Sequence, residues 1–302
     1  STMSNVNGGS WEQYMGANAS LVSKDNVYGI AVYQSYRNRN PYDVDGDSFS
    51  EIGKLNMNTF GLRAYYRPTQ FSRLNVEYHT TNEFRRGGNK FDMEPFETDI
   101  TEQTKHVINS GGLTYDLFWK EYKHKLSFYT SAQHVDRNSY YGAQQDPNAY
   151  GKTKDLTFVG GGMYVGNFDK VLFSPATFTA GLEYSHNNMH DIMAGYNRDL
   201  EQKVRIASAF FQNEWKMNDF TLLAGFRLDD HNLIDNLIFS PRVNMLYKPS
   251  DAFQGRLTWS TGFRAPQAYD EDLHITAVGG EGVLINLAEG LKPEKSNSFS
   301  GS

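Results

Sequence analysis

The chain has 302 residues, no cysteine and a formal net charge of −6. This excludes disulfides and thiolate metal sites and disfavours nucleic-acid binding, which needs a concentrated basic surface. Its 19 tyrosines and 20 phenylalanines are too many for a disordered chain. No apolar stretch approaches the roughly 18 residues of a membrane helix, but a transmembrane barrel hides its lipid face in every second residue.

Alternation of apolar and polar residues recurs along the whole chain and predicts strands. In one example, Leu182 and Tyr184 fall on one side of the chain while Glu183 and Ser185 fall on the other. Alternation alone also fits a β-sandwich. We expect strands at 12–23, 26–37, 54–68, 73–86, 102–118, 124–138, 154–168, 177–187, 203–216, 219–230, 236–249, 254–264 and 291–302, and we expect residues 1–6 to end one more.

The lengths of the strands and of their connections favour a membrane barrel. Many expected strands exceed the roughly five or six residues usual in soluble sheets and reach the roughly 9–11 residues that cross a bilayer. The connections alternate between short turns and long polar loops, which is the anatomy of an outer-membrane barrel. The long loops are expected at 38–53, 87–101, 139–153, 188–202 and 265–290. The predicted fold is therefore an all-β transmembrane antiparallel β-barrel.

Two motifs near the end of the chain point to a family. Residues 239–266 read FSPRVNMLYKPSDAFQGRLTWSTGFRAP, and residues 291–299 read LKPEKSNSF. In order and spacing they resemble the barrel of TonB-dependent outer-membrane receptors. The segment 287–291, LAEGL, departs from the family's usual Asn-Pro-Asn-Leu before Lys-Pro-Glu, which bears on the class of substrate.

The resemblance implies a fold and a partial domain. Barrels of this family have about 22 strands around a plugged lumen, whereas about fourteen are expected here. Residues 1–302 are therefore expected to form part of a TonB-dependent receptor β-barrel, without the plug domain and its energy-coupling segment.

The resemblance also implies a function, namely active import of a bulky scarce nutrient across the outer membrane of a Gram-negative bacterium. A ferric siderophore, haem and cobalamin all remain as substrates. The implied partners are the TonB energy-coupling complex, acting through the plug, outer-membrane lipid and a small-molecule or metal-chelate substrate; a surface lipoprotein is a further candidate. A passive porin is the alternative. No catalytic motif is present, so we do not expect an enzyme.

Substrate contacts are expected on the outer loops, because aromatic rings bury a large flat ligand and polar neighbours orient it. Each candidate could equally be an ordinary solvated loop residue. By the resemblance, His274 lies where haem receptors of the family place an axial histidine, but segment 270–274 also aligns with an ordinary Glu-Leu-aromatic run common to the family. The candidates are Tyr140, Tyr141, Tyr196, Arg198, Tyr269 and His274.

A second candidate site is an acidic loop after the expected strand 26–37. Asp43, Asp45 and Asp47 alternate along the chain, and Glu51 follows. Alternate oxygen donors on a tight turn suit Ca²⁺, which takes six to eight oxygen ligands. The full EF-hand pattern fails, and a solvated acidic loop is the simpler interpretation. No cofactor is required, and a structural calcium ion is the one candidate.

Overall fold

The computed structural model describes residues 2–7, 10–266 and 291–302. Within them, no helix has the length and apolar character needed to cross a bilayer. The strands are β1 (Thr2–Asn7), β2 (Ser10–Val22), β3 (Tyr28–Arg39), β4 (Ser50–Tyr66), β5 (Ser72–Gly88), β6 (Ile100–Trp119), β7 (His124–Ala143), β8 (Tyr150–Val171), β9 (Ser174–Met193), β10 (Arg198–Lys216), β11 (Phe220–His231), β12 (Ile238–Ser250), β13 (Phe253–Arg264) and β14 (Glu294–Gly301), with two single-turn 3₁₀ helices, η1 (Pro95–Glu97) and η2 (Ala194–Tyr196).

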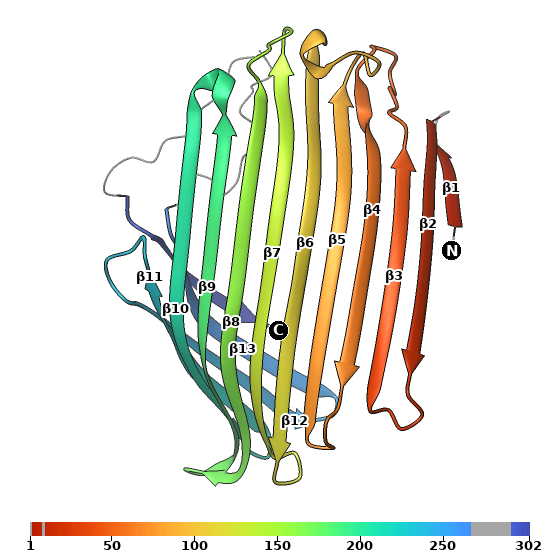
Figure 1. The fold of residues 1–302 in the computed structure, drawn as a ribbon. Helices are drawn as coiled ribbons and strands as arrows, with labels where there is room; N and C mark the ends of the chain where they lie inside the picture. The colour runs from red at the N-terminus through yellow and green to blue at the C-terminus, as the bar shows by residue number, and fades with distance from the viewer. Residues whose placement is uncertain (1, 8–9, 267–290) are drawn as a thin grey trace.

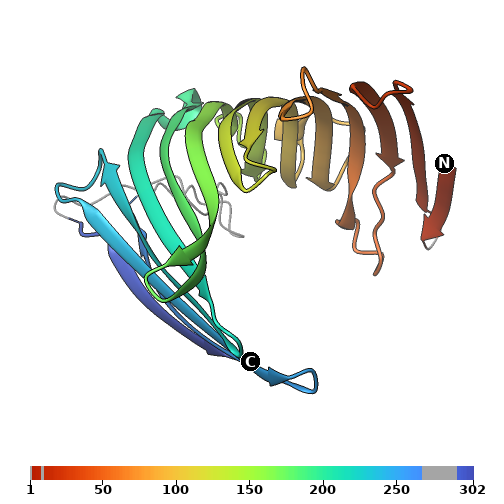
Figure 2. The ribbon, with the colours of Figure 1, turned by 90° about the horizontal axis from the view of Figure 1, so that it is seen from below.

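All fourteen strands form one antiparallel sheet in which each strand pairs with its neighbours in sequence. The long strands run side by side between a rim of short turns, at the bottom of Figure 1, and a rim of outer connections at the top. Seen from below, the sheet curves like an arch (Figure 2). The prediction of an all-β, antiparallel fold with about fourteen strands is confirmed.

The strand register sorts the side chains onto two chemically different faces, because directly paired residues point to the same side of a sheet. One row across β3 to β12 is apolar or aromatic throughout: Tyr28, Tyr66, Leu74, Tyr115, Phe128, Gly162, Leu182, Ala209, Leu228 and Phe239. The adjacent row faces the other way and is largely polar: Gly29, Tyr65, Asn75, Thr114, Tyr129, Gly161, Glu183, Ser208, Asp229 and Ile238.

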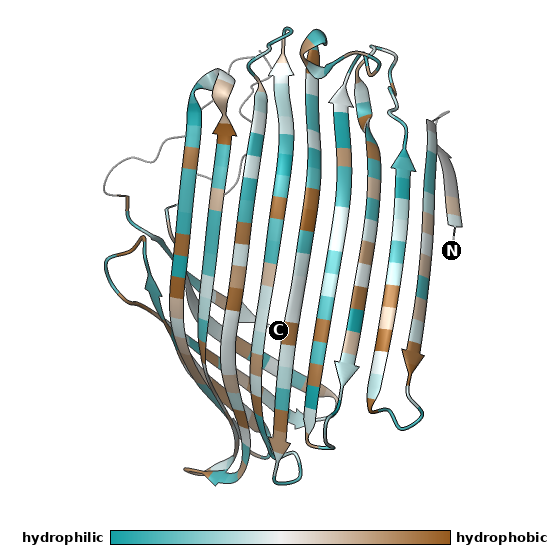
Figure 3. Ribbon diagram, in the orientation of Figure 1, coloured by the Kyte–Doolittle hydropathy of each residue, from teal (hydrophilic) through white to brown (hydrophobic). Residues whose placement is uncertain are grey.

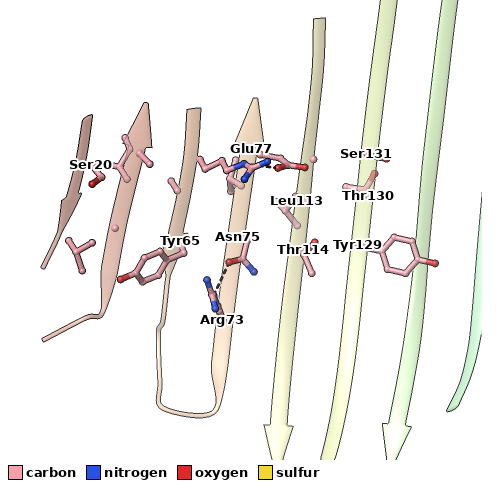
Figure 4. A pocket seen from close by; sticks show the side chains of 18 residues that line it. Ser20, Tyr65, Arg73, Asn75, Glu77, Leu113, Thr114, Tyr129, Thr130 and Ser131 are labelled. Carbon is pink, nitrogen blue, oxygen red and sulfur yellow. Dashed lines mark hydrogen bonds and ion pairs between the residues drawn. The ribbon is translucent and has the colours of Figure 1, made fainter. Parts of the chain in front are cut away.

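The polar face is the inner side of the curve. A cavity of about 770 Å³ is lined mainly by residues of that face, among them Tyr65, Asn75, Thr114 and Tyr129. These side chains come from neighbouring strands (Figure 4), where Arg73 donates to Asn75 across 2.8 Å. We call this side the concave face and the opposite side the apolar face.

The apolar face is apolar only over the part of each strand next to the short turns. On β9 it carries Phe178, Leu182 and Tyr184, and farther along the same face it carries His186 and His190. The band of apolar residues is about as wide as the roughly 9–11 residues with which a tilted strand crosses a bilayer. In Figure 3, hydrophilic colour likewise predominates toward the outer rim. The strands therefore extend well beyond the thickness of a membrane.

Because the strands continue beyond the membrane, two of the predicted loops are wrong. Residues 139–153 and 188–202 were expected to be long loops, but β7 continues to Ala143, β9 continues to Met193, and only 144–149 and 194–197 connect these strands to the next. The prediction failed because both faces are polar beyond the apolar band, so the alternation disappears while backbone pairing continues. The alternation of short turns with longer outer connections is correct, but the connections at 40–49, 89–99, 144–149 and 194–197 are shorter than expected.

Glycines on the concave face lie under aromatic rings of the neighbouring strand. A Cβ atom built on Gly161 would stand 2.6 Å from the Tyr129 hydroxyl and 2.7 Å from the Leu182 carbonyl oxygen. Tyr33 and Phe210 cover Gly61 and Gly181 in the same way. Aromatic residues that cover strand glycines fix the register of a sheet, which explains a glycine at 161.

Candidate functional site

The outer ends of β7 to β10 bring several of the predicted substrate residues together. Tyr141 lies near the end of β7, Tyr196 closes η2 and Arg198 opens β10. The register places Tyr141 and Arg198 on the concave face, where they face the space enclosed by the curve. Tyr269 and His274 lie outside the described residues. We call the concave surface at these strand ends the outer rim site.

A buried ionic network forms the centre of the outer rim site. Asp191 on β9 lies between two arginines, with its Oδ1 atom 3.6 Å from Arg137 Nη2 and its Oδ2 atom 3.3 Å from Arg198 Nε. Thr153 accepts hydrogen bonds from Arg137 and donates one to Asp191 across 2.6 Å. The Asp191 and Arg137 side chains are only 5% and 8% exposed. Two arginines therefore share the Asp191 carboxylate.

Aromatic and apolar side chains pack beside this network. Tyr141 is buried against Met193, and Tyr196 packs on both. The Tyr196 hydroxyl donates to Asp146 Oδ2 across 2.5 Å, which ties η2 to the 144–149 connection. This hydrogen bond lowers the pKa of Asp146. Burial raises the pKa of Tyr141 and, together with Asp146, that of Tyr196. Both tyrosines therefore stay neutral and keep their O–H donors at physiological pH.

Tyr140, unlike its neighbour Tyr141, does not lie on the concave face. Its position in the register is on the face opposite the concave one, and its side chain is 1% exposed. Its hydroxyl donates to the Asp146 carbonyl across 2.9 Å, its ring packs edge-on against Tyr150, and burial raises its pKa to about 12. In this arrangement Tyr140 supports the 144–149 connection, so a direct substrate contact would require movement of that connection.

The row of the concave face that contains Arg137 continues toward β5 through further charged residues. His106 pairs with Arg137 in the register, and Glu83 pairs with His106. Glu83 lies 2.7 Å from Arg85 Nε and 3.7 Å from His106 Nδ1. Burial, and then the charge of Arg137, lowers the pKa of His106. The concave face of this part of the outer rim therefore places Glu83, Arg85 and a neutral His106 beside the network of Arg137, Asp191 and Arg198.

Reasoning from sequence missed Arg137, Thr153 and Asp191. Arg137 lay inside an expected strand and Asp191 inside an expected loop, and no motif connects them. The one available signal was the alternation of side chains along the strand. Arg137 is an even number of residues from Tyr129, so both side chains point to the same face. Only the pairing of β7 with β8 and of β8 with β9 brings the three side chains into contact.

The acidic loop lies between β3 and β4. One carboxylate oxygen from each of Asp43, Asp45, Asp47 and Glu51 lies within 4.8 Å of the others. The loop folds around these groups, because the Gly46 and Ser48 amides donate to Asp43 across 2.7 and 2.8 Å. Within the described residues none of the four has a cationic side-chain partner. Such a cluster of oxygens has the donor chemistry that a hard cation requires.

Comparisons with known proteins agree with this architecture. The family model for the TonB-dependent receptor-like β-barrel matches residues 11–302. A search among curated protein sequences finds no match.

Several solved structures have a similar fold. The siderophore receptor PirA from Pseudomonas aeruginosa is 14% identical, with a TM-score of 0.71 over 96% of this chain and 48% of that one. A variant of the ferric enterobactin receptor PfeA from Pseudomonas aeruginosa, in complex with enterobactin, is 14% identical, with a TM-score of 0.69 over 88% of this chain and 43% of that one.

FpvA from P. aeruginosa, bound to a heterologous pyoverdine, is a third similar structure. It is 10% identical, with a TM-score of 0.70 over 96% of this chain and 44% of that one. At these identities the likeness concerns the fold alone. This chain spans less than half the length of each of the three proteins.

Proposed function

Because this chain belongs to the TonB-dependent receptor-like β-barrel family, we propose that it forms part of the barrel wall of a TonB-dependent transporter in the outer membrane of a Gram-negative bacterium. The family match over residues 11–302 carries this proposal. The apolar band then contacts lipid, the concave face lines the lumen, and the short turns face the periplasm. Energy for transport comes from the TonB complex acting through a plug domain, and a surface lipoprotein is a further candidate partner.

We propose a ferric siderophore as the substrate. One similar solved structure is a siderophore receptor by name and another is a ferric enterobactin receptor, and the outer rim site offers matching chemistry. Arg137 and Arg198 favour an anionic chelate, and Tyr141 and Tyr196 add neutral aromatic surface. Tyr269 and His274 remain proposed contacts from outside the described residues. Haem and cobalamin are the competing substrates.

Uptake experiments in cells test the transporter proposal. A strain lacking the gene, complemented with the full-length protein, should take up one labelled ferric siderophore and lose that uptake when the proton-motive force is collapsed. Haem and cobalamin uptake should match the deletion strain. Uptake that persists without the proton-motive force would support the alternative of a passive porin. Uptake of haem or cobalamin in place of every siderophore tested would overturn the substrate proposal alone.

We also propose that the acidic loop binds a structural calcium ion, which orders this outer connection. In the full-length protein, calcium should slow proteolytic nicking between Asn38 and Gly53 relative to chelator. The double variant D43N/D45N should be nicked at the fast rate in both conditions. The matched control D25N, in an inner turn, should behave as the wild type does. Equal nicking of the wild type with calcium and with chelator would contradict the proposal.

A further inference from the structure

A line of arginines on the concave face leads to the short-turn rim. Arg63 on β4, Arg67 directly after β4 and Arg73 on β5 are all exposed. Arg63 lies two residues from Tyr65 and therefore on the same, concave side of the strand. The guanidinium carbons of Arg67 and Arg73 lie over the Tyr65 ring, 5.5 and 5.2 Å from its centre. The outer rim site is at the opposite end of the strands, so these cations are separate from it.

The Tyr65 ring has a fixed place on the sheet and holds the two arginines that flank it. No Cβ atom would fit on Gly29, because the ring lies against this glycine of the neighbouring strand β3. An arginine that stacks on an aromatic ring keeps its N–H groups available for an anion. The Arg73 Nε atom donates to Asn75 across 2.8 Å (Figure 4), which leaves its two terminal nitrogens without an acceptor among the described residues.

Two cavities share Arg73. The cavity of about 770 Å³ on the concave face is lined by Arg63, Tyr65 and Arg73. A second cavity, of about 490 Å³, is lined by Arg67, Arg73 and Tyr122 among the short turns. Each has a size typical of small-molecule sites, which enclose roughly 300–1,000 Å³. The hollow surface therefore continues from the concave face to the short-turn rim. We call Arg63, Tyr65, Arg67 and Arg73 the inner mouth site.

Cations outnumber carboxylates in the lining of these two cavities. Arg63 shares Glu77, whose Oε2 atom lies 3.4 Å from the Arg63 Nε atom. Asp25 lines the second cavity. Arg67 and Arg73 have the Tyr65 ring beside them and no carboxylate within ion-pair distance in the part of the chain that the structure describes. Three guanidinium groups therefore accompany two carboxylates, which leaves positive charge for an anion.

We propose that the inner mouth site binds the anionic chelate as it leaves the lumen on the periplasmic side. This inference rests on the proposed function, which makes the concave face the lumen wall and the short turns its periplasmic end. The forked guanidinium groups match the carboxylate or catecholate oxygens that make such a chelate anionic. Because the arginines are exposed to water, each contact is weak. The site therefore holds the chelate briefly and releases it.

Fluorescence quenching on the full-length protein in neutral detergent tests this site, with ferric enterobactin as the anionic probe. A fluorophore attached at Gln70→Cys reports an iron chelate bound among the short turns, because Gln70 lines the second cavity. In this labelled background, R67Q/R73Q should weaken the apparent affinity at least tenfold. The matched control R242Q/R256Q removes two exposed arginines from the concave face of β12 and β13 and should leave the affinity unchanged. Heat-modifiable mobility shows whether each variant is folded.

Two further arms keep the test decisive. E77Q removes the carboxylate beside Arg63 and should tighten binding of the anionic probe, so a result remains even if the double variant does not fold. Ferrioxamine B, a ferric chelate that carries a positively charged ammonium group, should bind at least tenfold more weakly than ferric enterobactin. Equal affinities for the two chelates, no effect of E77Q, or equal losses in R67Q/R73Q and its control would overturn the proposal.

Uptake in cells separates this proposal from the proposed function. Cells that take up no siderophore would contradict transport, whatever the purified protein binds. Where a siderophore is taken up, R67Q/R73Q should lower the maximal rate and leave the half-saturating concentration unchanged, because capture at the outer rim precedes release. A raised half-saturating concentration with an unchanged maximal rate would place these arginines in capture and overturn their role in release.

Discussion

The half of the sheet next to the short turns and the half next to the outer rim share one backbone ladder but differ in their side chains. Near the turns, large apolar residues are exposed, as with Leu182 at 67%. Near the rim, charged residues are buried, as with Asp191, whose side chain is 5% exposed. The backbone hydrogen bonds are the same in both halves, whereas the polarity of the side chains matches the medium that each face contacts. In the membrane, hydrocarbon favours apolar side chains on the surface. Beyond the membrane the strand ends lie in water, where charged side chains can pack together as a buried ionic network.

The largest expected effect concerns the apolar band. Leu113→Arg combined with Leu182→Arg places two charges in hydrocarbon, at about 2–4 kcal/mol each, and the sites are far enough apart for the effects to add. The double variant of the full-length protein should fail to assemble in the outer membrane, as measured by heat-modifiable mobility. Ser131→Arg with Thr258→Arg, on the concave face, should assemble. If both pairs behave alike, the assignment of the two faces is wrong.

The buried ionic network of the outer rim should show the next largest effect. Asp191→Ala leaves Arg137 and Arg198 without their shared carboxylate, and breaking a buried ion pair costs about 3–5 kcal/mol. We expect the outer halves of β7 to β10 to exchange their amide hydrogens much faster, while the turn-side halves keep their protection. Asp199→Ala is the control, because that side chain is 71% exposed and its ion pair contributes at most about 1 kcal/mol.

Two neighbouring glycines sharpen the difference between the two faces. Gly161→Ala on the concave face should destabilise the full-length protein by about 1–3 kcal/mol through overpacking, because its Cβ would clash with Tyr129 and with a backbone carbonyl. Gly162→Ala, on the apolar face, would find its nearest neighbour at an ordinary 3.5 Å. Urea titration should therefore separate the two variants, and equal midpoints would show that Tyr129 moves aside freely.

The smallest effect expected is a dependence on pH at the outer rim. The Tyr196 hydroxyl lowers the pKa of Asp146 below its usual value of 3.8. The ionised carboxylate is therefore favoured in the folded state, and its contribution is present above that value and lost as the pH falls below it. Pepsin cleavage within 144–149 should accelerate in that range. Above pH 3.8, the Tyr196→Phe variant should be cleaved faster than the wild type, and its cleavage rate should change less with pH. Cleavage at the 120–123 turn serves as the control for global unfolding.

The membrane-spanning part of the fold could be predicted because its signal lies in each strand by itself. Residues such as Leu182 and Glu183 alternate wherever one face meets hydrocarbon and the other meets a polar lumen, so the number of strands and the short turns could be inferred without contacts. The outer extensions could not, since Asp191 and His190 are both polar and show no alternation. The acidic loop was visible in sequence because its four carboxylates come from one short segment.

By itself, the sequence determined that this chain is an antiparallel transmembrane sheet of a TonB-dependent receptor-like barrel, through alternation and through the motifs at 239–266 and 291–299. Only the tertiary structure decided how far the strands run past the membrane and which distant residues meet there. Arg137, Thr153 and Asp191 come from three strands, and their contact depends on a register that long-range pairing sets. Local patterns report the environment of a residue, whereas a site built across strands depends on partners that the chain order does not specify.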